Sequence, residues 1–139
     1  MGDDGCRAIV IAGAGACFSA GADLKEPIRD AADRRHRLNL LHQVVRLIVT
    51  GPKPVIAAVD GAAYGAGFSF AAACDLVVAT RQAQFGAAFG RIGLMPDAGL
   101  LWSLPQRVGF GLARELVFTG RPVDGEEAKA VGIADVLVE

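Results

Sequence analysis

Short apolar runs alternate along the chain with stretches of helical periodicity. The apolar runs, which are bounded by Gly, Pro or Asp, predict strands at Ala8–Ala12, Pro54–Val59, Leu76–Ala79, Ala83–Gly86 and Ala134–Leu137. Apolar residues at three- and four-residue spacing, or runs of small residues, predict helices at Asp30–Thr50, Gly65–Cys74, Pro96–Leu104, Gly109–Thr119 and Glu126–Val131. This alternation predicts one α/β domain over residues 1–139, with mainly parallel strands covered on both faces.

The composition narrows the classes of function. The 139 residues include 14 Lys+Arg and 15 Asp+Glu, so the basic excess typical of a nucleic-acid binder is absent. Hydrophobic residues make up 53% and charged residues 21%, which predicts a folded chain. The longest apolar runs fall short of the roughly 18 residues that span a membrane, and the acidic start Met1–Asp4 is unlike a signal peptide. Three cysteines without CxxC spacing predict reduced thiols in a cytoplasmic protein.

Motifs for phosphate binding and for nucleophilic catalysis are incomplete. Gly13–Gly15 and Gly65–Gly67 each lack the third glycine of GxGxxG, and the sequence contains no GxxxxGK[ST]. A G-x-S-x-G motif falls one residue short around Ser69, and His36 and His42 both precede this serine, whereas the hydrolase order places the histidine after it. The two histidines lie on different faces of their predicted helix, so we expect no metal pair.

Two loops of small residues directly follow predicted strands, at Phe18–Lys25 and Asp60–Gly67. Small side chains leave backbone N–H groups accessible, and a helix that begins in the second loop adds unpaired donors. Two such loops that converge would form an oxyanion hole for a carbonyl oxygen. Close-packed turns without a chemical role explain the same residues equally well.

Five segments of the chain resemble the crotonase, or enoyl-CoA hydratase/isomerase, superfamily. In the family's order they are Ala8–Gly13, Phe18–Glu26, Lys53–Gly61, Cys74–Ala79 and Gly93–Gly99. They are distributed from residue 8 to residue 99 of the chain. The resemblance implies a crotonase-like spiral of ββα repeats, truncated at both ends relative to the family, whose chains continue before Ala8 and after Glu139.

The resemblance also implies the ligand and the assembly. The ligand is an acyl-CoA thioester, with no separate cofactor, because coenzyme A is part of the substrate, and no metal. Members of the family form trimers or pairs of trimers, so we expect a homo-oligomer. The aromatic residues Trp102 and Phe110 are then expected in the core or at a subunit contact.

By position, the resemblance assigns the oxyanion-hole donors to the backbone N–H groups of Ala22 and Ala66. The Ala22–Lys25 segment would line the adenine end of the coenzyme A site, with Lys25 near a phosphate. The residues expected to bind substrate are Ala20, Asp23, Leu24, Lys25, Gly65, Ser69 and Phe89.

The departures from the family bear most on the reaction. Hydratases of the family carry two glutamates, and the matching positions here are Ser69 and Phe89. Phenylalanine cannot transfer a proton, and serine is a poor base without an activating partner. Asp97 matches the acid/base of some isomerases of the family, including that of phenylacetate degradation. An Asp at a helix start is also a preferred N-cap, and the two roles are compatible.

Three hypotheses follow. The first is an enoyl-CoA isomerase that uses Asp97 together with the Ala22 and Ala66 N–H groups. The second is an acyl-CoA-binding or assembly module that performs no chemistry. The third is an atypical hydratase that recruits Ser69.

Overall fold

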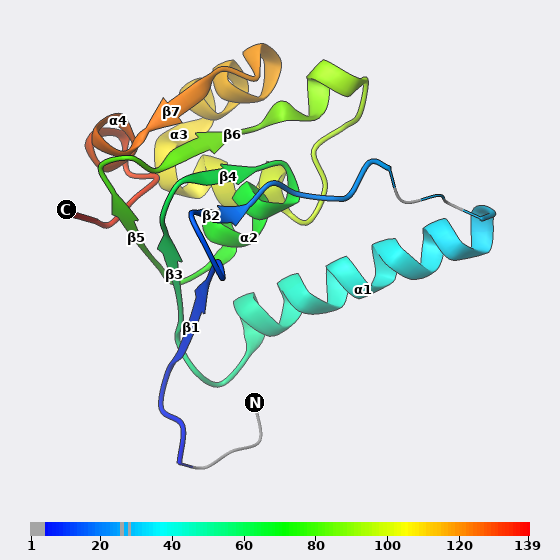
Figure 1. The fold of residues 1–139 in the computed structure, drawn as a ribbon, viewed down its shortest axis with the longest axis horizontal. Coiled ribbons are helices and arrows are strands. Elements are labelled where there is room, and N and C mark those ends of the chain that lie inside the picture. Colours follow the sequence, from blue (N-terminus) through cyan, green and yellow to red (C-terminus); the bar gives the residue numbers. More distant parts are fainter. Residues whose placement is uncertain (1–4, 26, 28) are drawn as a thin grey trace.

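The strands form two four-stranded sheets in the computed structural model, which describes residues 5–25, 27 and 29–139 (Figure 1). The first sheet has the order β1 (Ile9–Ala12), β3 (Val55–Val59), β5 (Leu76–Thr80) and β8 (Val136–Val138). The second has the order β2 (Cys17–Ser19), β4 (Ala62–Tyr64), β6 (Gln84–Gly86) and β7 (Pro122–Asp124). Neighbouring strands are parallel except β6 and β7. The chain therefore winds as a spiral that adds one strand to each sheet in turn.

Helical segments follow the strand pairs of this spiral. They are α1 (Ala31–Thr50), α2 (Ala66–Ala73), the 3-10 helix η1 (Ala88–Ile92), α3 (Leu100–Thr119) and α4 (Gly125–Val131). Aspartates cap two of them: Asp30 accepts from Asp33 N and Asp124 from Glu127 N, each at 2.8 Å. Gly109, with φ 77°, divides α3 into two segments at a kink.

Two aspartates join successive coils of the spiral through the same pattern of hydrogen bonds. Val55 N–H donates to the Asp75 carboxylate, and Val77 N–H donates to the Asp135 carboxylate, both at 2.7 Å. The backbone N–H groups of these aspartates donate back to the same two valines, at 2.9 and 2.8 Å. The starts of β3 and β5 are thereby closed by the next coil, which satisfies backbone groups at this edge of the first sheet.

The core lies between the sheets and the short helices. Phe68 of α2 and Phe85 of β6 are buried, with ring centroids 5.5 Å apart. Small residues let backbones approach closely: a Cβ added to Gly67 would lie 2.5 Å from the Ser19 carbonyl oxygen. The Gly/Ala-rich stretch predicted as a helix at Gly65–Cys74 therefore forms a close-packed helix, α2.

The predicted strands and helices are confirmed in place, with four corrections, one of which is that the 3-10 helix η1 was not predicted. Strands β2, β4 and β7 were missed, because each has three residues and is too short to show a periodic pattern. The helix predicted to begin at Pro96 begins at Leu100, after Gly99 in the left-handed conformation. The first sheet is fully covered on one face only: β3 alternates buried and half-buried positions, and α1 extends away from the body instead of lying across a sheet (Figure 1).

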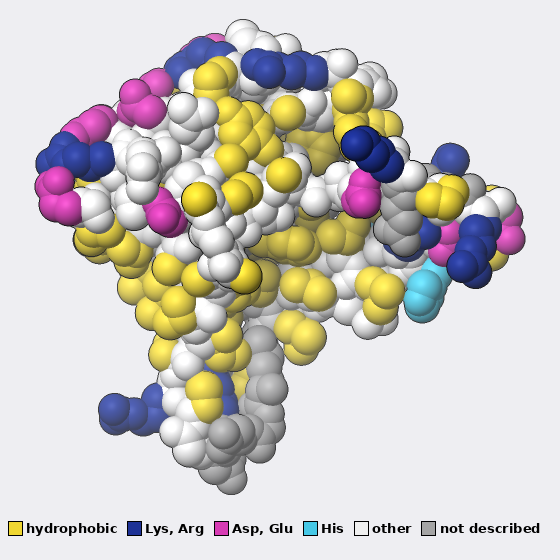
Figure 2. All heavy atoms as spheres, in the orientation of Figure 1, with side chains coloured by type: hydrophobic (Ala, Val, Ile, Leu, Met, Phe, Trp, Pro, Cys, Tyr) yellow, Lys and Arg dark blue, Asp and Glu magenta, His cyan; other side chains and the backbone are white. Residues whose placement is uncertain are grey.

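Hydrophobic side chains gather on the surface where the body of the molecule meets α1, and charged side chains collect at the outer ends of the molecule (Figure 2). Among the described residues, no helix combines the length and the apolar character that crossing a bilayer requires. Trp102 and Phe110 are 56% and 70% exposed, so neither lies in the core of this chain.

Candidate active site

A largely apolar cavity of about 370 Å³ lies where β2, β4, α1 and η1 meet. Its lining comes from five separate stretches of the sequence. The lining residues are Ser19, Ala20, Gly21, Ala22, Leu24, Leu41, Tyr64, Gly65, Ala66, Phe70, Ala88, Phe89, Arg91, Ile92, Leu94 and Asp97. Seven of the ten residues singled out from the sequence are in this lining: Ala20, Ala22, Leu24, Gly65, Ala66, Phe89 and Asp97.

The two small-residue loops meet at this cavity. A Cβ added to Gly21 would lie 3.3 Å from Ala66 N and 2.9 Å from the Tyr64 carbonyl oxygen, so the two backbones are in contact. Gly21 and Gly65 both have positive φ, 93° and 54°, which glycine adopts without strain. Ala66 is the first residue of α2, so its N–H has no partner within the helix. The loops converge as an oxyanion hole requires.

Asp97 is in the same lining, in the turn between η1 and α3. Burial raises the pKa of its carboxyl group above the ordinary value, while its own backbone N–H and His42 act in the lowering direction. Its Oδ1 atom is buried without a hydrogen-bond partner among the described residues. The N-cap of α3 is Gly99, so the predicted capping role of Asp97 is wrong. A carboxyl group facing an apolar cavity with an unused oxygen is typical of an acid/base residue.

The two positions that match the hydratase glutamates differ in their surroundings. Phe89 is buried in the cavity wall. Ser69 is fully buried in α2 outside the lining, and its hydroxyl lies 3.0 Å from the Asp97 carbonyl oxygen and 3.3 Å from the Gly65 carbonyl oxygen. Neither side chain offers the cavity a group that could activate water.

Asp23 and Lys25 are exposed and lie outside the lining. The Asp23 carboxylate accepts from Lys25 N at 2.9 Å, which shapes a local turn at the mouth of the site. Their predicted contacts with the distal part of a coenzyme A stay predictions.

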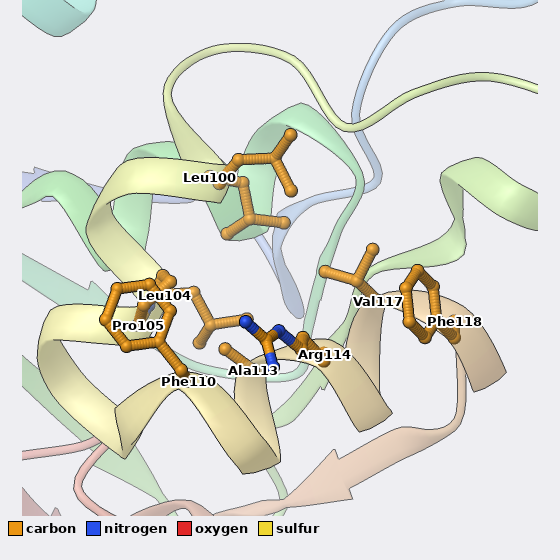
Figure 3. Close-up of a pocket in the computed structure, with 9 residues that line it drawn as sticks. Leu100, Leu104, Pro105, Phe110, Ala113, Arg114, Val117 and Phe118 are labelled. Atoms are coloured by element: carbon orange, nitrogen blue, oxygen red, sulfur yellow. The ribbon is translucent and has the colours of Figure 1, made fainter.

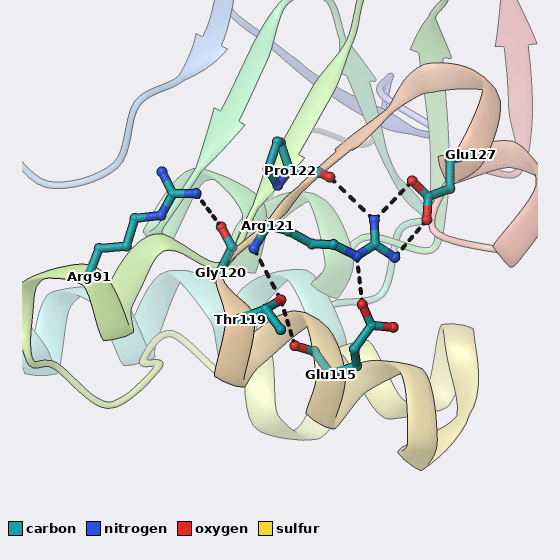
Figure 4. Close-up of polar contacts among 7 residues, drawn as sticks. All are labelled: Arg91, Glu115, Thr119, Gly120, Arg121, Pro122 and Glu127. Carbon is teal, nitrogen blue, oxygen red and sulfur yellow. Dashed lines mark hydrogen bonds and ion pairs between the residues drawn. The ribbon is translucent and has the colours of Figure 1, made fainter.

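Sequence reasoning missed part of the lining, namely Leu41, Tyr64, Phe70, Arg91, Ile92 and Leu94. Leu41 had a signal, since it lies on the apolar stripe of α1. Arg91 had none, because η1 was not predicted. Its guanidinium donates to the Gly120 carbonyl oxygen at 2.9 Å, next to Arg121, which is held by Glu115 and Glu127 (Figure 4). These contacts anchor η1 against the end of α3.

A second cavity of about 240 Å³ lies between the two segments of the kinked α3, lined by residues such as Leu104, Phe110 and Val117 (Figure 3). Its one charged lining residue is Arg114, whose guanidinium lies 5.9 Å from the centroid of the Phe110 ring. Among the described residues, the lining of this cavity contains no carboxyl, thiol or imidazole group.

Comparisons with known proteins agree with this geometry. The family profile described as enoyl-CoA hydratase/isomerase matches residues 1–139. The chain is 38% identical to the 1,2-epoxyphenylacetyl-CoA isomerase of Escherichia coli, over 99% of the chain and 54% of that protein. It is 39% identical to the human mitochondrial methylglutaconyl-CoA hydratase, over 88% of the chain and 36% of that protein.

The solved structures that are similar to this chain include members of the same family. An enoyl-CoA hydratase from Bacillus anthracis superposes with a TM-score of 0.93 at 34% identity, over 99% of this chain and 54% of that one. The chain spans about half the length of many of its curated relatives. The spiral of strand pairs is thus the crotonase fold, and the chain belongs to the enoyl-CoA hydratase/isomerase family.

Proposed function

We propose that the protein is an enoyl-CoA isomerase that shifts a double bond along an acyl chain, with Asp97 as its acid/base. The observation that carries this proposal is the position of Asp97: it is the one carboxyl group among the described residues that line the cavity. The same cavity holds the two loops that meet at Ala66 N.

In the proposed reaction, the thioester carbonyl oxygen accepts from the backbone N–H groups of Ala22 and Ala66. The Asp97 carboxylate removes a proton from the acyl carbon next to the carbonyl. The electron pair of the broken C–H bond moves onto the thioester oxygen as an enolate, which the two donors stabilise. Asp97 then returns its proton to the carbon two positions further along, and the electron pair re-forms the double bond in its new place.

Burial of the Asp97 carboxyl favours this exchange. A raised pKa makes the carboxylate a stronger base and brings it closer to the acidity of the carbon that it must deprotonate. The apolar lining excludes water, so the proton stays available for return to the substrate.

Hydration through Ser69 is a weaker candidate. A hydratase needs a group that activates water inside the cavity, and Ser69 is buried outside the lining with its hydroxyl directed at backbone carbonyl oxygens. The relatives include both hydratases and an isomerase, so the choice of reaction rests on these side chains.

The test is conversion of a 3-enoyl-CoA to the conjugated 2-enoyl-CoA, followed by the absorbance of the conjugated thioester, in wild type and in Asp97→Asn. We expect at least a roughly 100-fold loss of turnover in Asp97→Asn, since general acid/base groups contribute factors of about 100 to 10,000. Glu126→Gln is the matched control, because Glu126 is an exposed carboxylate paired with Arg81. Unchanged turnover in Asp97→Asn would rule out the assignment.

A second measurement separates an enzyme from a binding module. An acyl-CoA titrated into the protein in heavy water is followed both for heat and for deuterium uptake into the acyl chain. Binding with uptake supports the isomerase, and binding without uptake supports the module.

We also propose a homo-oligomer, which rests on the family and on the apolar surface of α3. Phe110 and Phe118 are 70% and 81% exposed on this helix. Contacts between copies would remove such side chains from water. Light scattering at low concentration tests the proposal, and a well-folded monomer would contradict it.

A further inference from the structure

We propose that Ser69 is a positioning residue whose hydroxyl holds the Asp97 peptide, so that the Asp97 carboxyl group stays in the cavity that the two small-residue loops also line. This inference rests on the proposed function of Asp97. It gives a role to a fully buried polar side chain that the isomerisation itself does not use.

The hydrogen bonds of Ser69 join two parts of the site that are far apart in sequence. Its hydroxyl carries one proton, and the Asp97 carbonyl oxygen, at 3.0 Å, is closer than that of Gly65, at 3.3 Å. The Asp97 carbonyl also accepts from Leu100 N at 3.1 Å, so the turn is held by both α2 and α3. Because α2 begins at Ala66, one hydroxyl links the helix with the candidate donor to the turn with the candidate acid/base.

The turn that Ser69 holds is strained. Ala98 has φ 47°, the one positive value among the described non-glycine residues, and Gly99 follows with φ 79°. An alanine adopts this conformation only where its surroundings impose it. Ala98 is buried, and the Ser69 bond acts on the carbonyl directly before it. Without that bond, the turn can relax toward an ordinary conformation, which changes the direction of the Asp97 side chain.

The consequence of relaxation is measurable at the carboxyl group. Burial is the largest cause of the raised pKa of Asp97, so a carboxyl that turns toward water should titrate closer to its ordinary value. His42 of α1 acts to lower the pKa of Asp97, and Arg91 of η1 lines the same cavity; α2 and the first turn of α3 contain no charged residue. A serine-to-alanine change leaves His42 and Arg91 in place, so a shift in the pKa of Asp97 would report on burial.

The experiment compares Ser69→Ala with Ser103→Ala in the full chain. Ser103 is the matched control, because it is also a buried helical serine and its hydroxyl donates to the carbonyl of Gly99, four residues earlier, at 3.2 Å. The pKa of the Asp97 carboxyl is measured by carbon-13 NMR titration, with Asp97→Asn identifying the resonance. We expect a lower pKa in Ser69→Ala and the wild-type pKa in Ser103→Ala. A wild-type pKa in folded Ser69→Ala would overturn the proposal.

A second variant, Ser69→Cys, tests the proposal if Ser69→Ala does not fold. Ser69→Cys keeps the size of the side chain and replaces the hydroxyl with a weaker donor, so we expect a pKa between those of wild type and the ordinary carboxyl. An unshifted pKa in folded Ser69→Cys would count against the proposal in that case.

Kinetics with a 3-enoyl-CoA separate this inference from the proposed function. We expect kcat to fall roughly 10- to 100-fold in Ser69→Ala with KM within about twofold of wild type, because a misplaced reactive group costs rate. A rise in KM at unchanged kcat would contradict a positioning role. If Asp97→Asn keeps full turnover, the proposed function fails, while the NMR shift still decides whether Ser69 holds the turn.

Discussion

The two helices that border the cavity differ in how they are held. Six of the eight residues of α2 are buried, whereas Ile48 is the one fully buried residue among the twenty of α1. Helix α2 contributes Ala66 and Phe70 to the cavity, and α1 contributes Leu41. The wall that presents the candidate N–H donor is therefore part of the core, and the wall contributed by α1 stands largely in solvent.

This difference shows how one cavity combines a fixed wall with a wall that can adjust. An oxyanion hole works only if its donors are already in place when charge develops, and α2 is fixed by packing against β2, β4 and α3. An apolar wall tolerates adjustment, since apolar contacts have no strict direction. We therefore expect substitutions in α2 to cost far more stability than matched substitutions in α1.

The largest difference is expected between Phe68→Ala in α2 and Leu40→Ala in α1. Phe68 is buried against Phe85, so its truncation should lower the free energy of unfolding by about 3–5 kcal/mol. Leu40 is 48% exposed, so its truncation should stay within about 0.5 kcal/mol of wild type. Urea unfolding followed by circular dichroism measures both. Equal losses would show that α1 is as firmly packed as α2.

The next prediction tests how much close packing in α2 contributes to stability. Gly67→Ala places a Cβ 2.5 Å from the Ser19 carbonyl oxygen, so a backbone must move, and we expect a loss of about 1–3 kcal/mol. Gly111→Ala in α3 is the control, because its added Cβ meets nothing within 4 Å. There alanine should stabilise the helix by up to about 1 kcal/mol. Thermal unfolding of both variants checks the opposite signs.

A smaller effect is expected at the start of α1. Asp30→Ala removes the carboxylate that accepts from Asp33 N, and loss of such a cap costs about 1 kcal/mol. Asp30→Asn keeps an acceptor and should stay near wild type. Because α1 has few buried residues, we expect hydrogen exchange to accelerate in its first turns before the core is affected. Uniform acceleration throughout the protein would contradict the division between the helices.

The smallest stability effect concerns Asp97, whose backbone carbonyl oxygen accepts from the Ser69 hydroxyl of α2. Its pKa is raised in the folded state, so the folded protein binds the proton more readily than the unfolded chain does. Stability from this group is present at low pH and is lost as the pH rises through the folded pKa. We expect Asp97→Asn to be more stable than wild type at neutral pH and equal to it well below the ordinary carboxyl pKa. Urea unfolding at both pH values measures the difference, and the opposite sign would contradict burial as the cause.

Much of the fold was predictable where residues repeat a clear pattern. The apolar runs placed β1, β3 and β5, and the helical spacing placed α1 and both segments of α3. The short strands β2 and β4 were not predicted, because Cys17–Ser19 and Ala62–Tyr64 consist of small or mixed residues that are typical of loops. Pro96 suggested a helix start, but the strained turn at Ala98 and Gly99 delays the helix to Leu100.

The candidate site was predictable where a residue type is itself the signal. Glycines near Ala22 and Ala66 marked loops in which backbones approach each other, whereas the roles of Ala22, Ala66 and Asp97 came from the resemblance to the family. The contribution of Arg91 carried no such signal, because it depends on where η1 comes to lie.

By itself, the sequence determined the order of the main elements, because this order follows from local pattern. Its motifs carried the resemblance that indicated the family and the candidate residues. Only the tertiary structure decided which of them meet. It brought Gly21 against Ala66, placed Asp97 in the same cavity, and left Asp23 and Lys25 outside it. It also turned the Ser69 hydroxyl toward the Asp97 backbone. Contacts between residues 28 or more positions apart depend on how the coils of the spiral stack, and no local pattern encodes that distance.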